Sequence, residues 1–430
     1  MMILNMKALL KVLKAVLIAA LTIVVLTSGK PVRTSRYVYV AAADSAPADK
    51  KLADFRCTGT NDELTINKAI ASLPYGGTVQ LLDGRYNIDS FPNEVTVKGK
   101  TEHIAIFFGA EDPAVSRTVN LIGTTENKSY NTHFGVHIHV TENAIRQMND
   151  VDSYIVIGSS DKRPDPYGSM TWCNNANFEN FYLYIGEAQK KMVGIACNRL
   201  GGSYIKQVGI YTESYFQHRF EHTKPPTPVV GSIGVISCSS SNDEMARIGW
   251  DTLNCGGMYI GALIQQVDHL IMMTCTFARC VYALYCTGGT PKTMTIINSC
   301  DEGCVHLPHF GGRGHVTAID YNIERFNLAY YPDDPTGDTE FYATEDKPGS
   351  WIGTFEYTLQ GWSGADPGKE GQHFWRLGKG EGKGIRTRNL NYDHTGVSKP
   401  NCPEYLERYF DTEENVWKTW NGSEWLPADK

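Results

Sequence analysis

The chain has 430 residues, a formal net charge of −7 and 20% charged side chains. This length accommodates one long repeat domain with smaller terminal regions, and the composition is that of an ordered globular protein. No cluster of basic residues of the kind that neutralises phosphates is present, so nucleic acid is excluded as an expected partner.

Positions 1–29 form a hydrophobic leader. Three lysines precede an uncharged run at positions 15–26, which is the order expected of a signal peptide or a signal anchor. Apolar residues at alternating spacings of three and four between Leu10 and Val24 suit a helical stalk equally well. Both interpretations stay open, and a linker rich in small residues follows at positions 30–51.

Residues 61–73 predict an amphipathic helix at the start of the next domain. Thr60 and Glu63 have the spacing of a capping box, and Pro74 ends the apolar pattern. Two short strands are predicted next, at residues 79–82 and 85–88. A helix in this position suits a lid over the open end of a solenoid, where apolar core and unpaired backbone need cover.

Between residues 52 and 330, short apolar runs alternate with turns, and several columns of residues repeat. Cys255, Cys280 and Cys304 recur at nearly equal intervals, and the same shift aligns Met245 with Leu270. A period of about 24 residues, with strands and no intervening helices, indicates a solenoid built from β-strands. We therefore predict an all-β fold, a right-handed parallel β-helix, for residues 52–330.

The repeated cysteines are predicted to fill the interior of the stack as small, soft apolar side chains. Disulfides between neighbouring rungs are the alternative. Cysteines and histidines at zinc-site spacing are absent from the sequence, so no structural metal is expected.

Residues 331–430 are predicted to form a separate C-terminal β region. It holds six of the eight tryptophans of the chain. Its end predicts a small hairpin, in which Asn421 and Gly422 supply the turn.

Two sets of residues carry a resemblance to known families. Residues 54–63, the helix after them and residues 76–79 resemble the opening of pectate-lyase-like β-helix proteins. Residues 299–308, residues 322–325 and the closing Trp-Asn-Gly-Ser-Glu-Trp module resemble tail-spike-like β-helix proteins from phages and prophages of gut Firmicutes.

The resemblance implies a tail-spike or receptor-binding protein that recognises a cell-surface polysaccharide. It also implies a homotrimer, located on the virion tail or at the cell surface, and leaves depolymerase activity open. The hydrophobic leader departs from this pattern, so an exported or membrane-anchored bacterial enzyme of pectate-lyase or glycoside-hydrolase type is the alternative. A structural or adhesive surface protein is a further alternative.

Two pairs of acidic residues are candidates for catalysis. Glu302 aligns with Glu324 one rung further along the chain, with Asp301 beside them, and Asp243 aligns with Asp268 in the same way. Carboxylates on adjacent rungs approach the separation of about 5 to 5.5 Å found in retaining glycosidases, or supply ligands for a calcium ion in a lyase. We favour the pair formed by Glu302 and Glu324, against the plain alternative that these turn carboxylates are only solvated.

An aromatic segment is the candidate for glycan binding. Its rings suit stacking on sugars, although core packing or a subunit contact explains them equally well. His137 and His139 fall on one side of a predicted strand, with His133 just before it, and are expected to line the outer wall rather than bind a metal. The candidate glycan-binding residues are Tyr211, Tyr215, Phe216 and His218.

Overall fold

The computed structural model describes the greater part of the chain after residue 35. The chain divides into two units, Met1–Arg36 and Tyr37–Lys430, and every helix and strand described below belongs to the second. The predicted leader at positions 1–29 lies outside the described residues. These residues are 36–97, 100–109, 117–124, 135–158, 174–186, 192–197, 200–212, 215, 231–237, 245–265, 267–286, 293–302, 304, 308–310, 313–325, 350–361, 384–389, 408–411, 416–421 and 423–427.

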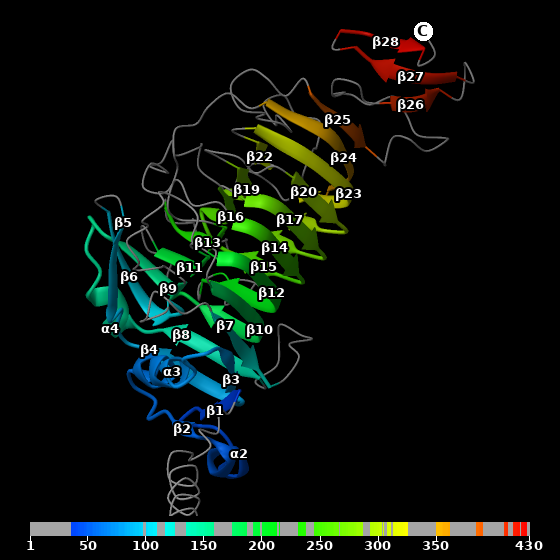
Figure 1. Cartoon of the computed structure of the whole chain (residues 1–430). Coiled ribbons are helices and arrows are strands. Elements are labelled where there is room, and N and C mark those ends of the chain that lie inside the picture. The colour runs from blue at the N-terminus through cyan, green and yellow to red at the C-terminus, as the bar shows by residue number, and fades with distance from the viewer. Residues whose placement is uncertain are drawn as a thin grey trace, which may run out of the picture. The chain divides into compact units, whose positions relative to one another are not determined.

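The fold is predominantly β, and most of its strands belong to one large parallel sheet (Figure 1). A second sheet of eight strands is also parallel except at its edge, where β5 (Asn93–Val97) pairs antiparallel with β6 (Lys100–Phe107). Parallel strands that pair with equivalents one repeat further along the chain are compatible with a β-helix or solenoid. Within the described residues, no helix has the length and apolar character needed to cross a bilayer.

Each rung of the stack contributes up to three strands, most regularly between residues 245 and 325. Each strand pairs with the equivalent strand of the next rung, which produces three stacked surfaces that we name the first, second and third faces. The rungs of this segment are β14 (Met245–Asp251), β15 (Asn254–Gly256) and β16 (Ile260–Ile264); β17 (Val267–Met273), β18 (Thr276–Ala278) and β19 (Tyr282–Cys286); β20 (Thr293–Ile297), β21 (Cys300–Glu302) and β22 (His309–Phe310); and β23 (Arg313–Arg325), which spans the first two faces.

The earlier strands join the same three faces through their pairing. The first face includes β1 (Tyr37–Ala41), with β2 (Phe55–Arg56) beside it, β3 (Gly77–Leu81), β7 (Arg117–Gly123) and the first halves of β10 (Asn174–Tyr184) and β12 (Leu200–Tyr211). The second face includes β4 (Gly84–Ile88), β8 (Val136–Val140) and the second halves of β10 and β12. The third face includes β6, β9 (Ser153–Gly158), β11 (Met192–Ala196) and β13 (Ile233–Ile236).

The spacing between rungs is close to the predicted period, but several predicted alignments across the first of them are wrong. Ile248 pairs with Leu270, and Leu270 pairs with Met294, so the first of these two rungs is slightly shorter than the second. Met245 therefore pairs with Val267 rather than with Leu270. The prediction treated Cys255 and Cys280 as equivalent, yet Cys280 lies beyond the end of β18.

Single residues in the left-handed backbone conformation bend the chain between the first and second faces. Their φ angles lie between 48° and 61°. One such residue turns the chain without a loop, and Asn and Asp tolerate this conformation better than most side chains do. The bend residues are Asn180, Gln207, Thr252, Thr274, Asn298 and Asp320.

The interior of the stack is apolar and includes most of the described cysteines. All eight described cysteines are free thiols, and all but the half-buried Cys300 are buried. Burial raises the pKa of Cys197 and of Cys275 to about 12, so these thiols stay protonated. The prediction that the cysteines fill the core is confirmed for seven of these eight, Cys300 being the exception.

The predicted N-terminal helix is present as α3 (Asp62–Ala71), but its start differs from the prediction. Asn61 is the N-cap residue, in a left-handed conformation and without a side-chain cap, so Thr60 does not form a capping box. The buried Glu63 carboxylate instead accepts hydrogen bonds from Ser90 Oγ at 2.6 Å and from the Asp89 amide at 3.1 Å. Two short helices, α2 (Pro47–Leu52) and α4 (Glu142–Arg146), complete the helical elements described.

Parallel pairing continues beyond the predicted boundary at residue 330. β24 (Ser350–Gly361) pairs with β23, and β25 (Gly384–Asn389) pairs with β24. The predicted C-terminal hairpin is confirmed as antiparallel β26 (Arg408–Asp411), β27 (Val416–Trp420) and β28 (Trp425–Pro427). Its last turn is held by Asn421, whose Oδ1 accepts hydrogen bonds from the amides of Ser423 and Glu424, both at 2.8 Å.

Candidate functional site

The favoured carboxylate pair occupies adjacent rungs on the second face. Glu302 in β21 pairs with Glu324 in β23, which confirms the predicted alignment. Strands paired in this way lie about 4.8 Å apart. Glu302 is half-buried at the surface. The register therefore brings together two backbone positions at a spacing compatible with acid-base chemistry on a sugar.

Asp301 does not belong to that pair. Its strand neighbours are Phe277 and Ile323, and its side chain is fully buried in the interior column. Asp301 Oδ1 accepts a hydrogen bond from the Cys304 amide at 3.2 Å. Because adjacent residues of a strand point to opposite sides, Asp301 faces the core whereas Glu302 faces outward. Asp301 is thus not positioned to contact a polysaccharide.

The second predicted pair is not aligned as expected. Asp243 lies outside the described residues, and Asp268 is half-buried in β17. The neighbours of Asp268, Val267 and His269, pair with Met245 and Arg247. Asp268 is therefore opposite position 246, because this rung is shorter than the prediction assumed.

The predicted glycan-stacking tyrosines are buried. Tyr211 and Tyr215 are each 1% exposed, and their rings stack on one another with centroids 5.7 Å apart and planes 7° apart. The Cβ of any residue larger than glycine at position 256 would lie 2.6 Å from the Tyr215 ring, so Gly256 leaves the room that this ring occupies. These two rings are packing residues, and Phe216 and His218 lie outside the described residues.

The histidines on β8 extend this aromatic packing. The ring of His139 stacks on Tyr184 at a centroid distance of 4.3 Å, and His137 lies near Tyr182 at 5.4 Å. Burial, with the nearby positive charge of Arg85, lowers the pKa of His139 to about 3, so this imidazole is neutral at physiological pH. His133 lies outside the described residues. Across the residues that the structure describes, no cluster of three or more metal-ligating side chains occurs.

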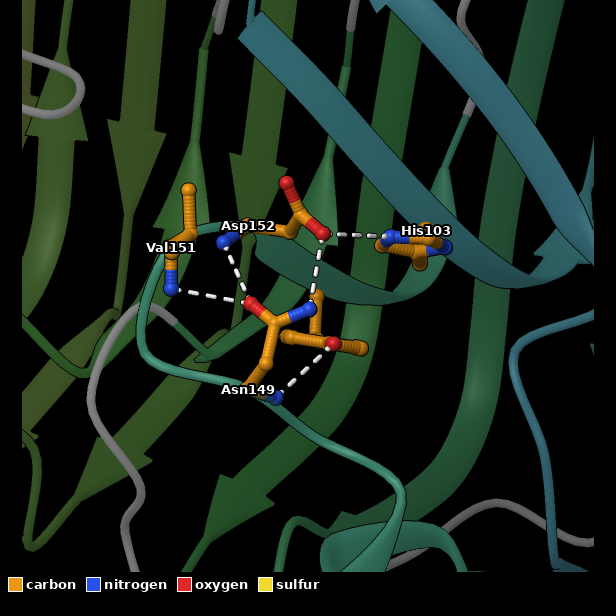
Figure 2. Close-up of polar contacts among 5 residues, drawn as sticks. His103, Asn149, Val151 and Asp152 are labelled. Carbon is orange, nitrogen blue, oxygen red and sulfur yellow. Dashed lines mark hydrogen bonds and ion pairs between the residues drawn. The ribbon is translucent and has the colours of Figure 1, made fainter.

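A histidine and an aspartate that the sequence did not single out meet near the start of β9. Figure 2 shows Asp152 between His103 on β6 and Asn149, with His103 Nε2 3.1 Å from Asp152 Oδ2. Asn149 Nδ2 donates to the same carboxylate oxygen at 2.8 Å, and Asn149 Oδ1 accepts from the amides of Val151 and Asp152. The His103 ring also stacks on Tyr154 at 5.0 Å. These contacts link the turn before β9 to β6.

An open groove of about 550 Å³ lies on the outer side of the first face. It crosses five consecutive rungs, from Thr118 on β7 to Ile271 and Met273 on β17. Four steps of about 4.8 Å between strands give it a length of about 19 Å. A groove of this length and openness suits an extended ligand better than a small molecule, which is usually enclosed.

Asparagine side chains line one end of the groove. Asn177 Nδ2 donates to Asn120 Oδ1 at 2.8 Å, and Asn120 Nδ2 donates to Thr78 Oγ1 at 3.1 Å. The exposed Asn175 lies beside them and donates to Thr118 Oγ1 at 3.3 Å. Side-chain amides both donate and accept, so this end matches the paired donors and acceptors of sugar hydroxyls.

A tyrosine ring forms the middle of the groove. Tyr204 pairs with Gly249, and a Cβ at position 249 would lie 2.6 Å from the tyrosine ring. The ring therefore lies flat across the next rung, where its hydroxyl donates to Asp251 Oδ2 at 3.2 Å. Burial, together with the Asp251 carboxylate, raises the pKa of Tyr204, so the phenol keeps its proton. The exposed Arg247 lies on the same strand as Gly249 and adds a planar cationic donor.

Sequence reasoning missed this groove. Its residues come from rungs that are far apart in the chain, as the pairing of Asn177 with Tyr204 and of Tyr204 with Gly249 shows, so no local motif connects them. The repeated Asn-x-Asn and Thr-x-Asn patterns at residues 175–177 and 118–120 were the available signal, because alternate residues of a strand share one face.

Comparison with known proteins adds no relative: no protein-family model, no curated protein and no solved structure matches the chain.

Proposed function

We propose that the chain is a right-handed parallel β-helix, with α3 as the lid of its N-terminal end, that binds a polysaccharide along the groove of the first face. The observation that carries this proposal is the composition of the groove. Within this groove of five rungs, amides on β10, a flat tyrosine ring on β12 and an arginine on β14 follow one another. Aromatic faces pack on the apolar faces of sugars, while amides and guanidinium groups bind their hydroxyl and carboxylate groups.

The resemblance to tail-spike proteins supports the biological setting of this proposal. In that setting the protein is a homotrimer that recognises a cell-surface polysaccharide from the virion tail or from the surface of a cell. The alternative is an exported or membrane-anchored bacterial enzyme that acts on carbohydrates. Sedimentation velocity of the full chain tests the trimer, since a monomer would contradict it.

Binding to a panel of bacterial and plant polysaccharides, measured by biolayer interferometry, tests the groove. Tyr204→Ala and Arg247→Ala should each weaken binding of any bound polysaccharide by about tenfold or more, which corresponds to about 1.4 kcal/mol. Tyr75→Ala and Arg146→Ala are matched controls, because both residues are well exposed and lie outside the groove. Binding that survives both groove substitutions would contradict the proposal.

Cleavage of the bound polysaccharide is a second candidate function, and the register of Glu302 with Glu324 is the observation that favours it. One carboxylate of such a pair stays charged while its neighbour donates a proton. The panel should be assayed for new reducing ends and for the absorbance of unsaturated uronates.

Glu302→Gln and Glu324→Gln should each abolish cleavage and leave binding intact. Glu142→Gln, at an exposed position in α4, is the control. Activity that persists in both variants would exclude this pair.

A further inference from the structure

The lining of the groove becomes apolar at the end formed by β17. Ile271 and Met273 on β17 line the groove, and Ile271 is 48% exposed. Ile271 pairs with Gly249, the residue over which the Tyr204 ring lies. The apolar side chain thus occupies the rung next to the tyrosine platform and faces the same side of the sheet.

The apolar lining continues beyond the groove. Met273 pairs with Ile297, and Ile297 pairs with Ile319, which are 38% and 47% exposed. Isolated apolar side chains at a surface are ordinary, but a contiguous strip that runs out of a groove usually marks a contact surface. The C–H faces of an unsubstituted sugar ring would give Ile271 and Met273 only limited apolar contact, whereas a methyl or acetyl group would give them a larger apolar surface.

We propose that the glycan bound in this groove carries apolar substituents, namely O-acetyl or N-acetyl groups or the methyl group of a 6-deoxy sugar, and that Ile271 and Met273 receive them. This inference rests on the proposed function, because it names the chemical class of the ligand for the same groove. In this arrangement one sugar ring of the glycan lies on Tyr204, and the methyl group of the next sugar unit lies over β17.

Paired methyl glycosides that differ by one such group test the inference. We would use methyl α-L-fucoside against methyl α-L-galactoside, and methyl N-acetyl-β-D-glucosaminide against methyl β-D-glucoside, at millimolar concentrations. The full chain, labelled with ¹³C at isoleucine δ1 and methionine ε methyl groups, reports where each sugar binds.

In each pair, the sugar with the methyl or acetyl group should shift the Ile271 and Met273 methyl resonances. It should also bind about fourfold more tightly than its counterpart, the effect expected from burying one methyl group. Ile271→Thr, which keeps the branched β-carbon that suits a strand, should remove this preference. Ile319→Thr is the matched control, because Ile319 is equally exposed and lies outside the groove.

Three results with the sugars would overturn the inference: equal affinities within both pairs, shifts at Ile319 instead of Ile271, or no methyl shift with any of the four sugars. A change in oligomeric state caused by Ile271→Thr, with unchanged sugar binding, would overturn it in favour of an interface between copies of the chain.

The proposed function fails separately, when Tyr204→Ala and Arg247→Ala leave polysaccharide binding unchanged. Binding that depends on Tyr204 but shows no preference for methylated sugars leaves the function standing and rejects this inference alone.

Discussion

The side-chain amide of Asn177 donates a hydrogen bond of 2.8 Å to Oδ1 of Asn120 on the neighbouring rung. Asn120 in turn donates to Thr78, so one half-buried amide links three rungs of the first face. Asn120→Ala removes both bonds and leaves their partners without this contact. We expect a loss of about 1 to 2 kcal/mol in the free energy of unfolding, measured by urea denaturation.

Asn175→Ala provides the comparison for this prediction. Asn175 is exposed and makes only the longer contact to Thr118, at 3.3 Å. Its removal should change the stability by less than about 0.5 kcal/mol, as is usual for surface substitutions. Equal losses in the two variants would mean that the amide ladder does not stabilise the stack.

Two glycines that lie beneath tyrosine rings should respond differently to substitution. Gly249→Ala adds a Cβ that would lie 2.6 Å from the half-buried Tyr204 ring. This ring can move away from the sheet to make room. We expect about tenfold weaker polysaccharide binding with little loss of stability. Gly256→Ala meets the buried Tyr215 ring, which has no such freedom, so we expect a loss of about 1 to 3 kcal/mol from overpacking. Thermal unfolding and binding assays on both variants separate these effects.

The buried Glu63 predicts a specific dependence of stability on pH. Burial raises the pKa of Glu63 above its value in the unfolded chain, so the folded state binds more protons as the pH falls. The contribution of this group to stability therefore decreases as the pH rises from the unfolded pKa through the raised folded pKa. The stability of the wild type relative to Glu63→Gln should decline across this window, as measured by urea unfolding between about pH 4 and pH 8.

A difference between the wild type and Glu63→Gln that stays constant with pH would show that the buried carboxyl titrates alike in the folded and unfolded states. Glu142→Gln, at a side chain that is 83% exposed, controls for the loss of one carboxyl group at the surface.

The described cysteines predict a selective pattern of thiol labelling. In the native protein, Cys300 should react with a thiol reagent before the other seven, because it alone among the eight is not buried. Burial keeps thiols such as Cys275 protonated and therefore unreactive. Peptide mass spectrometry after timed labelling checks the order, and labelling in denaturant should reach all eight. A disulfide among them would contradict the free-thiol state.

The general fold was accessible from the sequence because most inward-facing residues are apolar on every rung. The alternation of short apolar runs with turns between residues 52 and 330 reflects that apolar interior. The register between rungs was harder to predict, because a buried cysteine fits the interior equally well within a strand and at the turn between two strands. Cys255 lies on a strand and pairs with Phe277, whereas Cys280 lies beyond a strand, so the separation of the two cysteines overstates the length of their rung.

The candidate site was predicted only in part. Glu302 and Glu324 lie in the regular segment, where counting residues suffices to align them. Tyr204 and Gly249 come from rungs separated by a long segment of chain, so their pairing depends on a register that no periodicity reveals. The burial of Tyr211 and Asp301 was equally hidden, because a strand residue of either kind can face the core or the surface.

Rungs that stack in register differ widely in the length of chain between them. Leu121 pairs with Phe178, and Ile248 pairs with Leu270, so the first of these rungs uses more than twice as much chain as the second. The strands thus act as a fixed frame from which segments of almost any length can be exchanged. Each doubling of such a segment costs only about 0.6 kcal/mol of closure entropy. Grafting foreign peptides between rungs should therefore be feasible, and a lineage of such proteins is free to vary the length of these segments while its frame stays constant.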